Sequence, residues 1–195
     1  MSQPQAQYDI TEAEYLALEK NAPVRHEYVD GQRYAMAGAA DKHNRVAMNI
    51  GFHLRRQTRG TACVTYMNDM KLRMDNGRYQ YYPDVMLCCD PTDNPDPYYR
   101  ERPCVLVEVL SPNTFSTDKR EKLLNYQRNP SVRYYLIVSP EQVQVDYYQR
   151  NAQGQWEQAL LESGEILSMR CGDRKLQLTL ANIYEDMGML DGSLG

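Results

Sequence analysis

Apolar and polar positions follow helix-like and strand-like periods in turn along this chain, and the N-terminal part shows both kinds. Thr11 and Glu14 have the T-x-x-E spacing of a capping box, so a short helix is predicted from about residue 12 to before Pro23. Asp30-Gly31 then separates two alternating segments, which is the strongest hairpin signal in the sequence. A helix followed by a β-hairpin is therefore expected first.

A longer amphipathic helix is predicted over about 42–58, with Asp41 as its N-cap and its apolar residues in one stripe. His43 lies on that stripe, near the start of the helix. We interpret it first as a core histidine with one hydrogen-bond partner. The alternative is that its ring contacts a carboxylate or approaches a substrate.

The remaining chain alternates between strand signals and one helical stretch. Alternation over 63–74, a turn signal at Asp75-Asn76-Gly77 and a second strand over about 78–89 predict an antiparallel pair. Residues 90–102 carry three prolines and are expected to form an excursion without regular structure. After it we expect, in order, an apolar strand over 103–110, a helix over about 117–128, a strand over 133–139, a hairpin, and a short terminal strand and helix.

The length of 195 residues predicts a single domain spanning 1–195, with flexible ends at 1–8 and 189–195. Its 22 Lys and Arg against 26 Asp and Glu give a net charge of −4, which argues against a protein that coats nucleic acid by bulk charge. A local basic cleft remains compatible with that charge. The sequence has no stretch of about 18–20 apolar residues and no signal-peptide pattern at its start, so we expect a cytoplasmic protein without a membrane span.

Five cysteines are present, an odd number without any C-x-x-C pair, and most lie in apolar runs. We expect them to be reduced residues of the core. Cys88 and Cys89 are neighbours on one predicted strand and should point to opposite faces, which disfavours a zinc site.

Glu108 is the residue that points most clearly to chemistry, because it is the one charged residue in the apolar strand over 103–110. A buried carboxylate is costly unless a cation compensates it. A salt bridge to a core arginine would be enough to compensate the charge of Glu108. Asp84, taken alone, would be interpreted as a residue of a turn or of a strand entry. Together, however, Asp84 and Glu108 can lie on one sheet face, where two carboxylates suit Mg²⁺ or Mn²⁺.

The predicted helix after this strand carries Asp118, Lys122 and Tyr126 at positions i, i+4 and i+8. One interpretation is an exposed Asp–Lys pair that contributes at most about 0.5 kcal/mol. The functional interpretation is that Lys122 points toward the two carboxylates, where its ammonium positions a water molecule and stabilises phosphate charge.

These segments together resemble a known family. The resemblance is carried by Tyr82-Pro83-Asp84-Val85, by 106–114 around Glu108, by Asp118, Lys122 and Tyr126, and by the strand over 134–138. In this order they are similar to the Uma-two family of the PD-(D/E)xK restriction-endonuclease-like superfamily. The resemblance implies an α/β (mixed α+β) fold with a restriction-endonuclease-like core: a central mixed β-sheet flanked by helices, with additional β-hairpins.

The resemblance also implies the roles of individual residues. Asp84 and Glu108 become metal ligands, and Glu27 becomes a third ligand or an orienting group, although an exposed hairpin glutamate would look the same in sequence. The superfamily's usual lysine, two positions after the glutamate, is replaced here by Leu110. The family's relocated lysine corresponds to Lys122.

The function predicted from these features is a metal-dependent phosphodiesterase, an endonuclease that hydrolyses DNA through a Mg²⁺-activated water. Asp84, Glu108 and the backbone carbonyl of Val109 would bind Mg²⁺, for which Mn²⁺ can substitute, with Glu27 as a further ligand and Lys122 as the catalytic cation. The main alternative is a catalytically silent nucleic-acid or protein binding module that keeps the nuclease fold. A third is a metal-free hydrolase that uses the two acids as an acid–base pair. Cutting both strands would favour a homodimer.

Overall fold

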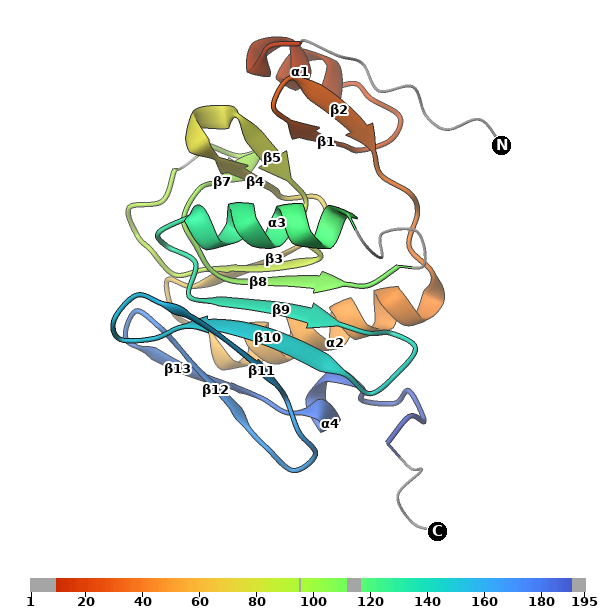
Figure 1. Cartoon of the computed structure of the whole chain (residues 1–195), viewed down its shortest axis with the longest axis vertical. Helices are drawn as coiled ribbons and strands as arrows, with labels where there is room; N and C mark the ends of the chain where they lie inside the picture. The colour runs from red at the N-terminus through yellow and green to blue at the C-terminus, as the bar shows by residue number, and fades with distance from the viewer. Residues whose placement is uncertain (1–9, 95, 112–116, 191–195) are drawn as a thin grey trace.

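A computed structural model describes residues 10–94, 96–111 and 117–190 of the chain (Figure 1). Its helices are α1 (Glu12–Glu19), α2 (Asp41–Gln57), α3 (Thr117–Arg128) and α4 (Leu180–Ile183), with a 3-10 turn at Asp75–Gly77. Its strands are β1 (His26–Val29), β2 (Gln32–Ala35), β3 (Val64–Met67), β4 (Lys71–Met74), β5 (Tyr79–Tyr81), β6 (Val85–Cys88), β7 (Tyr99–Arg100), β8 (Pro103–Val109), β9 (Tyr134–Val138), β10 (Val145–Arg150), β11 (Trp156–Leu160), β12 (Leu167–Cys171) and β13 (Arg174–Leu178).

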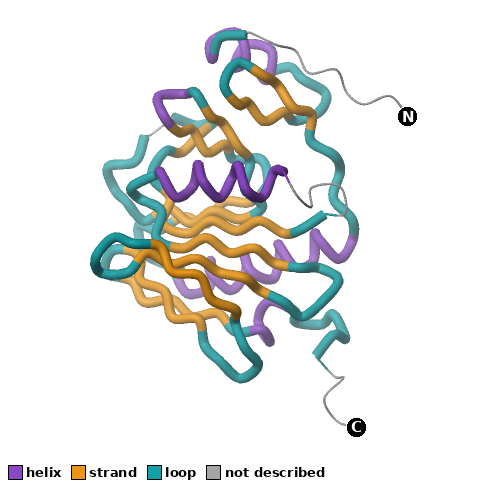
Figure 2. The backbone as a smooth tube through the Cα atoms, in the orientation of Figure 1, coloured by secondary structure: helices purple, strands orange, loops and turns teal. Residues whose placement is uncertain are grey.

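The central sheet has six strands in the order β11-β10-β9-β8-β6-β3. It is mixed, because β8 and β9 run parallel whereas the other neighbours are antiparallel. Figures 1 and 2 show α2 and α3 on opposite sides of this sheet. The predicted architecture, a central mixed sheet flanked by helices with additional hairpins, is therefore confirmed.

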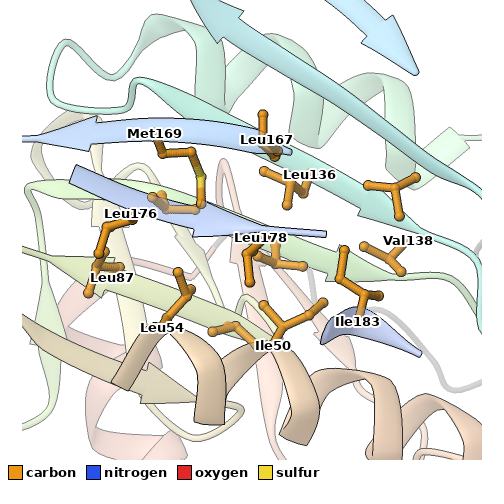
Figure 3. Packing of buried hydrophobic residues seen from close by; sticks show 14 of the residues in the cluster. Ile50, Leu54, Leu87, Leu136, Val138, Leu167, Met169, Leu176, Leu178 and Ile183 are labelled. Carbon is orange, nitrogen blue, oxygen red and sulfur yellow. The ribbon is translucent and has the colours of Figure 1, made fainter. Parts of the chain in front are cut away.

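The two faces of β8 serve two different hydrophobic clusters. Val105, Val107 and Val109 belong to the cluster that includes residues of α2, α4 and the β12–β13 hairpin. Figure 3 shows part of this cluster, with Ile50 of α2, Leu178 of the hairpin and Ile183 of α4 among the labelled residues. Leu106 packs in the other cluster, which includes Tyr126 of α3 and strand residues of the second sheet. Because side chains alternate along a strand, Glu108 belongs to the same face as Leu106, toward α3.

The second sheet has five strands in the order β2-β1-β5-β4-β7 and carries the N-terminal hairpin at its edge. That hairpin is confirmed: Asp30 and Gly31 both have positive φ, at 48° and 88°, as a tight two-residue turn requires. The helix before it is also confirmed, because Thr11 and Glu14 form the predicted capping box.

The predicted long antiparallel pair over 63–89 is wrong in one respect, because both of its arms are broken. The first arm divides into β3 and β4 around Asn68, whose φ is 45°, and the second divides into β5 and β6 at 82–84. As a result β4 pairs with β5 in the second sheet, while β3 pairs with β6 in the central sheet. Pro83 lacks an N–H to donate, which favours a break at that point.

Other boundaries also differ from prediction. The excursion over 90–102 contains the short strand β7, which pairs parallel to β4. A hairpin, β12–β13, replaces the single terminal strand. Ala40 rather than Asp41 is the N-cap of α2, and it makes no side-chain cap bond. Most of the predicted flexible ends, 1–8 and 189–195, lie outside the described residues, but 189 and 190 pack against the core.

The expectation of five reduced cysteines is wrong in the structure. Two disulfides are present, Cys63–Cys89 and Cys104–Cys171, and Cys88 is a buried free thiol. The first pair follows from the sheet register: extending the β3–β6 pairing by one residue places Cys63 opposite Cys89. This partner choice depends on strand pairing, which sequence spacing alone did not indicate.

None of the described helices combines the length and the hydrophobicity that a membrane crossing requires.

Candidate active site

Asp84 and Glu108 face each other across two neighbouring strands. Val85 pairs with Val107 in the β6–β8 ladder, and continuing this antiparallel register by one residue sets Asp84 opposite Glu108. Directly opposite residues share a sheet face, with Cβ atoms about 5 Å apart. In addition, the backbone N–H of Val109 donates to Asp84 Oδ2 at 2.7 Å. The register thus brings the two predicted metal ligands together.

The break between β5 and β6 explains why Asp84 can adopt this position. Its own carbonyl accepts a hydrogen bond from the Asn68 N–H at 3.2 Å, at the matching break in the other arm. Its side chain accepts the backbone N–H of Val109 in β8.

Lys122 contacts two acids at this end of β8. Its Nζ lies 2.7 Å from Glu27 Oε1 and 3.4 Å from both carboxylate oxygens of Glu108. The three side chains are each only 14–15% exposed. Glu27 also accepts a hydrogen bond from the Tyr82 N–H at 3.3 Å. The predicted inward direction of Lys122 is confirmed, and Glu27 is not the exposed hairpin residue that sequence left open.

Tyr126 completes the surroundings of Glu108. This fully buried tyrosine donates its hydroxyl proton to Glu108 Oε1 at 2.6 Å. The Lys122 ammonium also lies 5.6 Å from the centre of the Tyr81 ring, at a distance where a cation is attracted to an aromatic face. Glu108 is thus held from the helix side by two residues that are one helical turn apart on α3.

The electrostatics of the site reflect an excess of acid over base. The pKa of Glu108 is raised to about 7, chiefly by burial and also by the charges of Asp84 and Glu27, although Lys122 and the Tyr126 hydroxyl lower it. Burial lowers the pKa of Lys122, but Glu108 and Glu27 outweigh it and hold that pKa well above its ordinary value. Lys122 therefore stays protonated, and its ammonium contacts two carboxylates, those of Glu27 and Glu108.

His43 lies beside Asp84 at the start of α2. Its Nε2 is 3.4 Å from Asp84 Oδ2, and its Nδ1 has no hydrogen-bond partner among the described residues. Burial lowers the pKa of the ring, but Asp84 and the Val109 backbone outweigh this effect, so the net shift is upward. The carboxylate contact that sequence raised as the less favoured interpretation of His43 is therefore present.

The donor set suits a hard divalent cation with few protein ligands. No group of three or more His, Cys, Asp or Glu side chains in the described part of the chain is arranged to hold a metal ion. Mg²⁺ commonly binds through one or two carboxylates and keeps several water molecules, so Asp84 and Glu108 meet that requirement. The residues present therefore fit Mg²⁺, with Glu27 engaged by Lys122 instead.

The structure brings together Glu27, Asp84, Glu108 and Lys122, with the Val109 backbone beside Asp84. The cation that contacts Glu108 is Lys122 and not the core arginine that was considered as an alternative. The side chain of Asp118 lies outside the described residues. The direct hydrogen bond from Tyr126 to Glu108 was not predicted, although the i, i+4 spacing from Lys122 is a signal from which it could have been found.

Comparison with protein families gives one match that covers most of the chain. The Uma2 family model, described as "Putative restriction endonuclease", matches residues 12–181. Two proteins of Synechocystis sp. are also similar. Uncharacterized protein slr1290 is 35% identical over 75% of this chain and 77% of its own length, and uncharacterized protein sll1609 is 30% identical over 75% and 84%.

A solved structure has the same fold. It is a crystal structure of a putative nuclease belonging to DUF820 from Anabaena variabilis, with a TM-score of 0.72 and 15% identity. The alignment covers 90% of this chain and 97% of that chain. At this identity the likeness concerns the fold, and it agrees with the predicted restriction-endonuclease-like core.

Proposed function

Because this chain belongs to the Uma2 family of putative restriction endonucleases, we propose that it is a Mg²⁺-dependent endonuclease that hydrolyses phosphodiester bonds in DNA. One observation carries the proposal: the register sets Asp84, just before β6, opposite Glu108 near the end of β8, and Lys122 contacts Glu108 from α3. Buried acids around one lysine are costly for stability alone. They are useful where a cation and a phosphate must bind together.

Asp84, Glu108 and the carbonyl of Val109 would hold the Mg²⁺, and Mn²⁺ would substitute for it. When bound, the ion supplies Lewis-acid stabilisation of phosphate charge and lowers the pKa of water for attack on phosphorus. Tyr126 fixes Oε1 of Glu108 by its hydrogen bond, which orients the second oxygen, Oε2. The Val109 N–H fixes the carboxylate of Asp84 in the same way.

Lys122 acts on the phosphate as a permanent cation. Its raised pKa keeps the proton on Nζ, so it neutralises charge that develops on the phosphate and does not act as a base. Glu27 holds the ammonium at 2.7 Å and Glu108 lies at 3.4 Å, so the shorter contact sets its position. In this assignment Glu27 is a positioning residue for Lys122, and the lysine missing at Leu110 is supplied from α3.

The competing function is a catalytically silent module that keeps the nuclease fold. The observation in its favour is that Lys122 already gives both Glu27 and Glu108 a partner, so the site is partly neutralised without an ion. The two proposals differ in what divalent ions do. An endonuclease needs the ion for turnover, whereas a silent module binds its partner without hydrolysing it.

The test is cleavage of supercoiled plasmid, linear duplex and single-stranded DNA with Mg²⁺, with Mn²⁺ and with EDTA. Glu108→Gln and Asp84→Asn are compared with Asp173→Asn, whose carboxylate is 81% exposed on the β12–β13 turn. We expect ion-dependent cleavage by wild type and by the Asp173 variant, and none by the other two. Cleavage that persists in EDTA would favour the metal-free acid–base pair, and no cleavage of any DNA would favour the silent module.

A further inference from the structure

Tyr81, the last residue of β5, contacts two successive turns of α3. Its hydroxyl accepts a hydrogen bond from Asn125 Nδ2 at 2.7 Å and donates one to Glu121 Oε1 at 3.0 Å. Its ring lies edge-to-face with the ring of Tyr126, with ring centres 5.5 Å apart. The centre of the same ring lies 5.6 Å from Lys122 Nζ. The hydroxyl and the ring of Tyr81 therefore reach different residues of the helix.

The hydroxyl explains how a tyrosine can be buried at this position. Tyr81 is 1% exposed and Asn125 is 6% exposed. Buried polar groups are costly unless they are hydrogen-bonded, and here each of the two side chains bonds the other. This contact stabilises the packing of β5 on α3. It does not account for the ring beside the Lys122 ammonium.

The ring adds a third contact to an ammonium that two acids already hold. Lys122 Nζ lies 2.7 Å from Glu27 on β1 and 3.4 Å from Glu108 on β8. A lysine ammonium is a point charge on a flexible four-carbon stem, so two carboxylates alone leave it free to shift between them. An aromatic face within about 6 Å attracts an ammonium, and the attraction is strongest where water is excluded. The Lys122 side chain is 15% exposed, which meets that condition.

We propose that Tyr81 is a positioning residue, whose ring holds the Lys122 ammonium in place between Glu27 and Glu108. Its effect on hydrolysis rests on the proposed function, because it acts on the reaction only through Lys122. The hydroxyl, in contrast, serves stability through Asn125. Substitutions that remove the hydroxyl alone, or the ring as well, separate the two roles.

The experiment compares Tyr81→Phe, which keeps the ring, with Tyr81→Leu, which removes it. The kcat of plasmid cleavage at saturating Mg²⁺ is measured for each, with Lys122 intact and in the Lys122→Ala background. Tyr184→Leu is the matched control, because Tyr184 is also 1% exposed and its hydroxyl is hydrogen-bonded to the backbone of Gln144, but it belongs to the other hydrophobic cluster. Urea denaturation gives the stability of every variant.

We expect Tyr81→Leu to lower kcat on the order of 10-fold without changing the affinity for Mn²⁺. Tyr81→Phe and Tyr184→Leu should lose stability but keep the kcat of wild type. In the Lys122→Ala background Tyr81→Leu should have no further effect, because the group through which it acts is gone. The inference is overturned if Tyr81→Leu turns over as wild type does, if Tyr81→Phe loses as much as Tyr81→Leu, or if the loss is the same with and without Lys122.

A measurement without substrate follows the same contact. Protein labelled with ¹³C at the lysine Cε atoms gives an NMR signal for Lys122, which is identified by its absence from Lys122→Ala. The ring current of Tyr81 shifts this signal, so it should move in Tyr81→Leu and stay nearly in place in Tyr81→Phe and Tyr184→Leu. An unmoved signal in Tyr81→Leu overturns the inference even where wild type cleaves DNA. A signal that moves as expected in a protein that cleaves no DNA overturns only the endonuclease and supports the ring–ammonium contact.

Discussion

Lys122 Nζ lies closer to Glu27 than to Glu108, at 2.7 Å against 3.4 Å from each Glu108 oxygen. The helix lysine is therefore anchored by the N-terminal hairpin and directed at the sheet carboxylate. This arrangement supplies a cation where Leu110 stands in the place of the lysine on the strand. It also links three segments that are far apart in the sequence, so each can be tested by substitution.

Replacing Lys122 by Ala should keep the fold and the metal but lower turnover by on the order of 10²-fold or more, because a positioned cation is lost from the developing phosphate charge. The rate of plasmid cleavage at saturating Mg²⁺ measures this effect. Lys175→Ala, which alters an exposed lysine of β13, is the matched control and should be silent. Wild-type turnover by Lys122→Ala, in an assay where Glu108→Gln is inactive, would refute the relocated lysine.

Glu27→Gln separates the two roles considered for this residue. As a positioning residue, Glu27 contributes only to the placement of Lys122, so we expect turnover to fall by roughly 10-fold with unchanged affinity for Mn²⁺. Glutamine keeps an oxygen that can accept from the Tyr82 N–H, so the local backbone contact is retained. If Mn²⁺ affinity falls as far as it does in Asp84→Asn, Glu27 is a ligand and the positioning role is wrong.

His43 is expected to position Asp84, which it contacts through Nε2 at 3.4 Å. His43→Ala should weaken Mn²⁺ binding on the order of 10-fold, as the loss of a group that orients a ligand does. His43→Gln carries an amide that can reach the position of Nε2 and should recover part of that affinity. Equal losses in the two variants would show that the ring serves packing alone.

The two disulfides should contribute measurably to stability. The chain-entropy model assigns about 3–5 kcal/mol to loops of this size, with the larger value for the larger loop. The sequence separations are 67 for Cys104–Cys171 and 26 for Cys63–Cys89, so Cys104→Ala should lower the free energy of unfolding somewhat more than Cys63→Ala. Urea denaturation without reductant measures both. A wild-type transition that does not move when dithiothreitol is added would contradict the prediction.

The sequence was sufficient for features that depend on neighbouring residues. The Thr11–Glu14 capping box, the Asp30-Gly31 turn and the helix over Thr117–Arg128 were all predicted from local patterns, and the structure contains them. A cationic partner for Glu108 was also accessible, because a carboxylate in an apolar strand requires a compensating cation, and Lys122 is that cation.

Features that depend on how distant segments pack together could not be predicted from the sequence in the same way. The breaks at Asn68 and Pro83 move half of each arm into another sheet, and alternation of apolar residues continues across them. The Cys104–Cys171 bond joins β8 to β12 across the core, which no spacing rule indicates. Lys122 could be assigned to a helix face from sequence, but its 2.7 Å contact with Glu27 depends on how the hairpin and α3 pack together.

Titration of the metal-free protein with Mn²⁺, monitored by isothermal calorimetry, tests the central claim that Asp84 and Glu108 form one divalent-ion site. Wild type and the control Asp173→Asn should bind one ion with equal affinity, and Asp84→Asn and Glu108→Gln should each lose binding while remaining folded by circular dichroism. The same affinity in all four proteins, or no Mn²⁺ binding by wild type, would contradict the account.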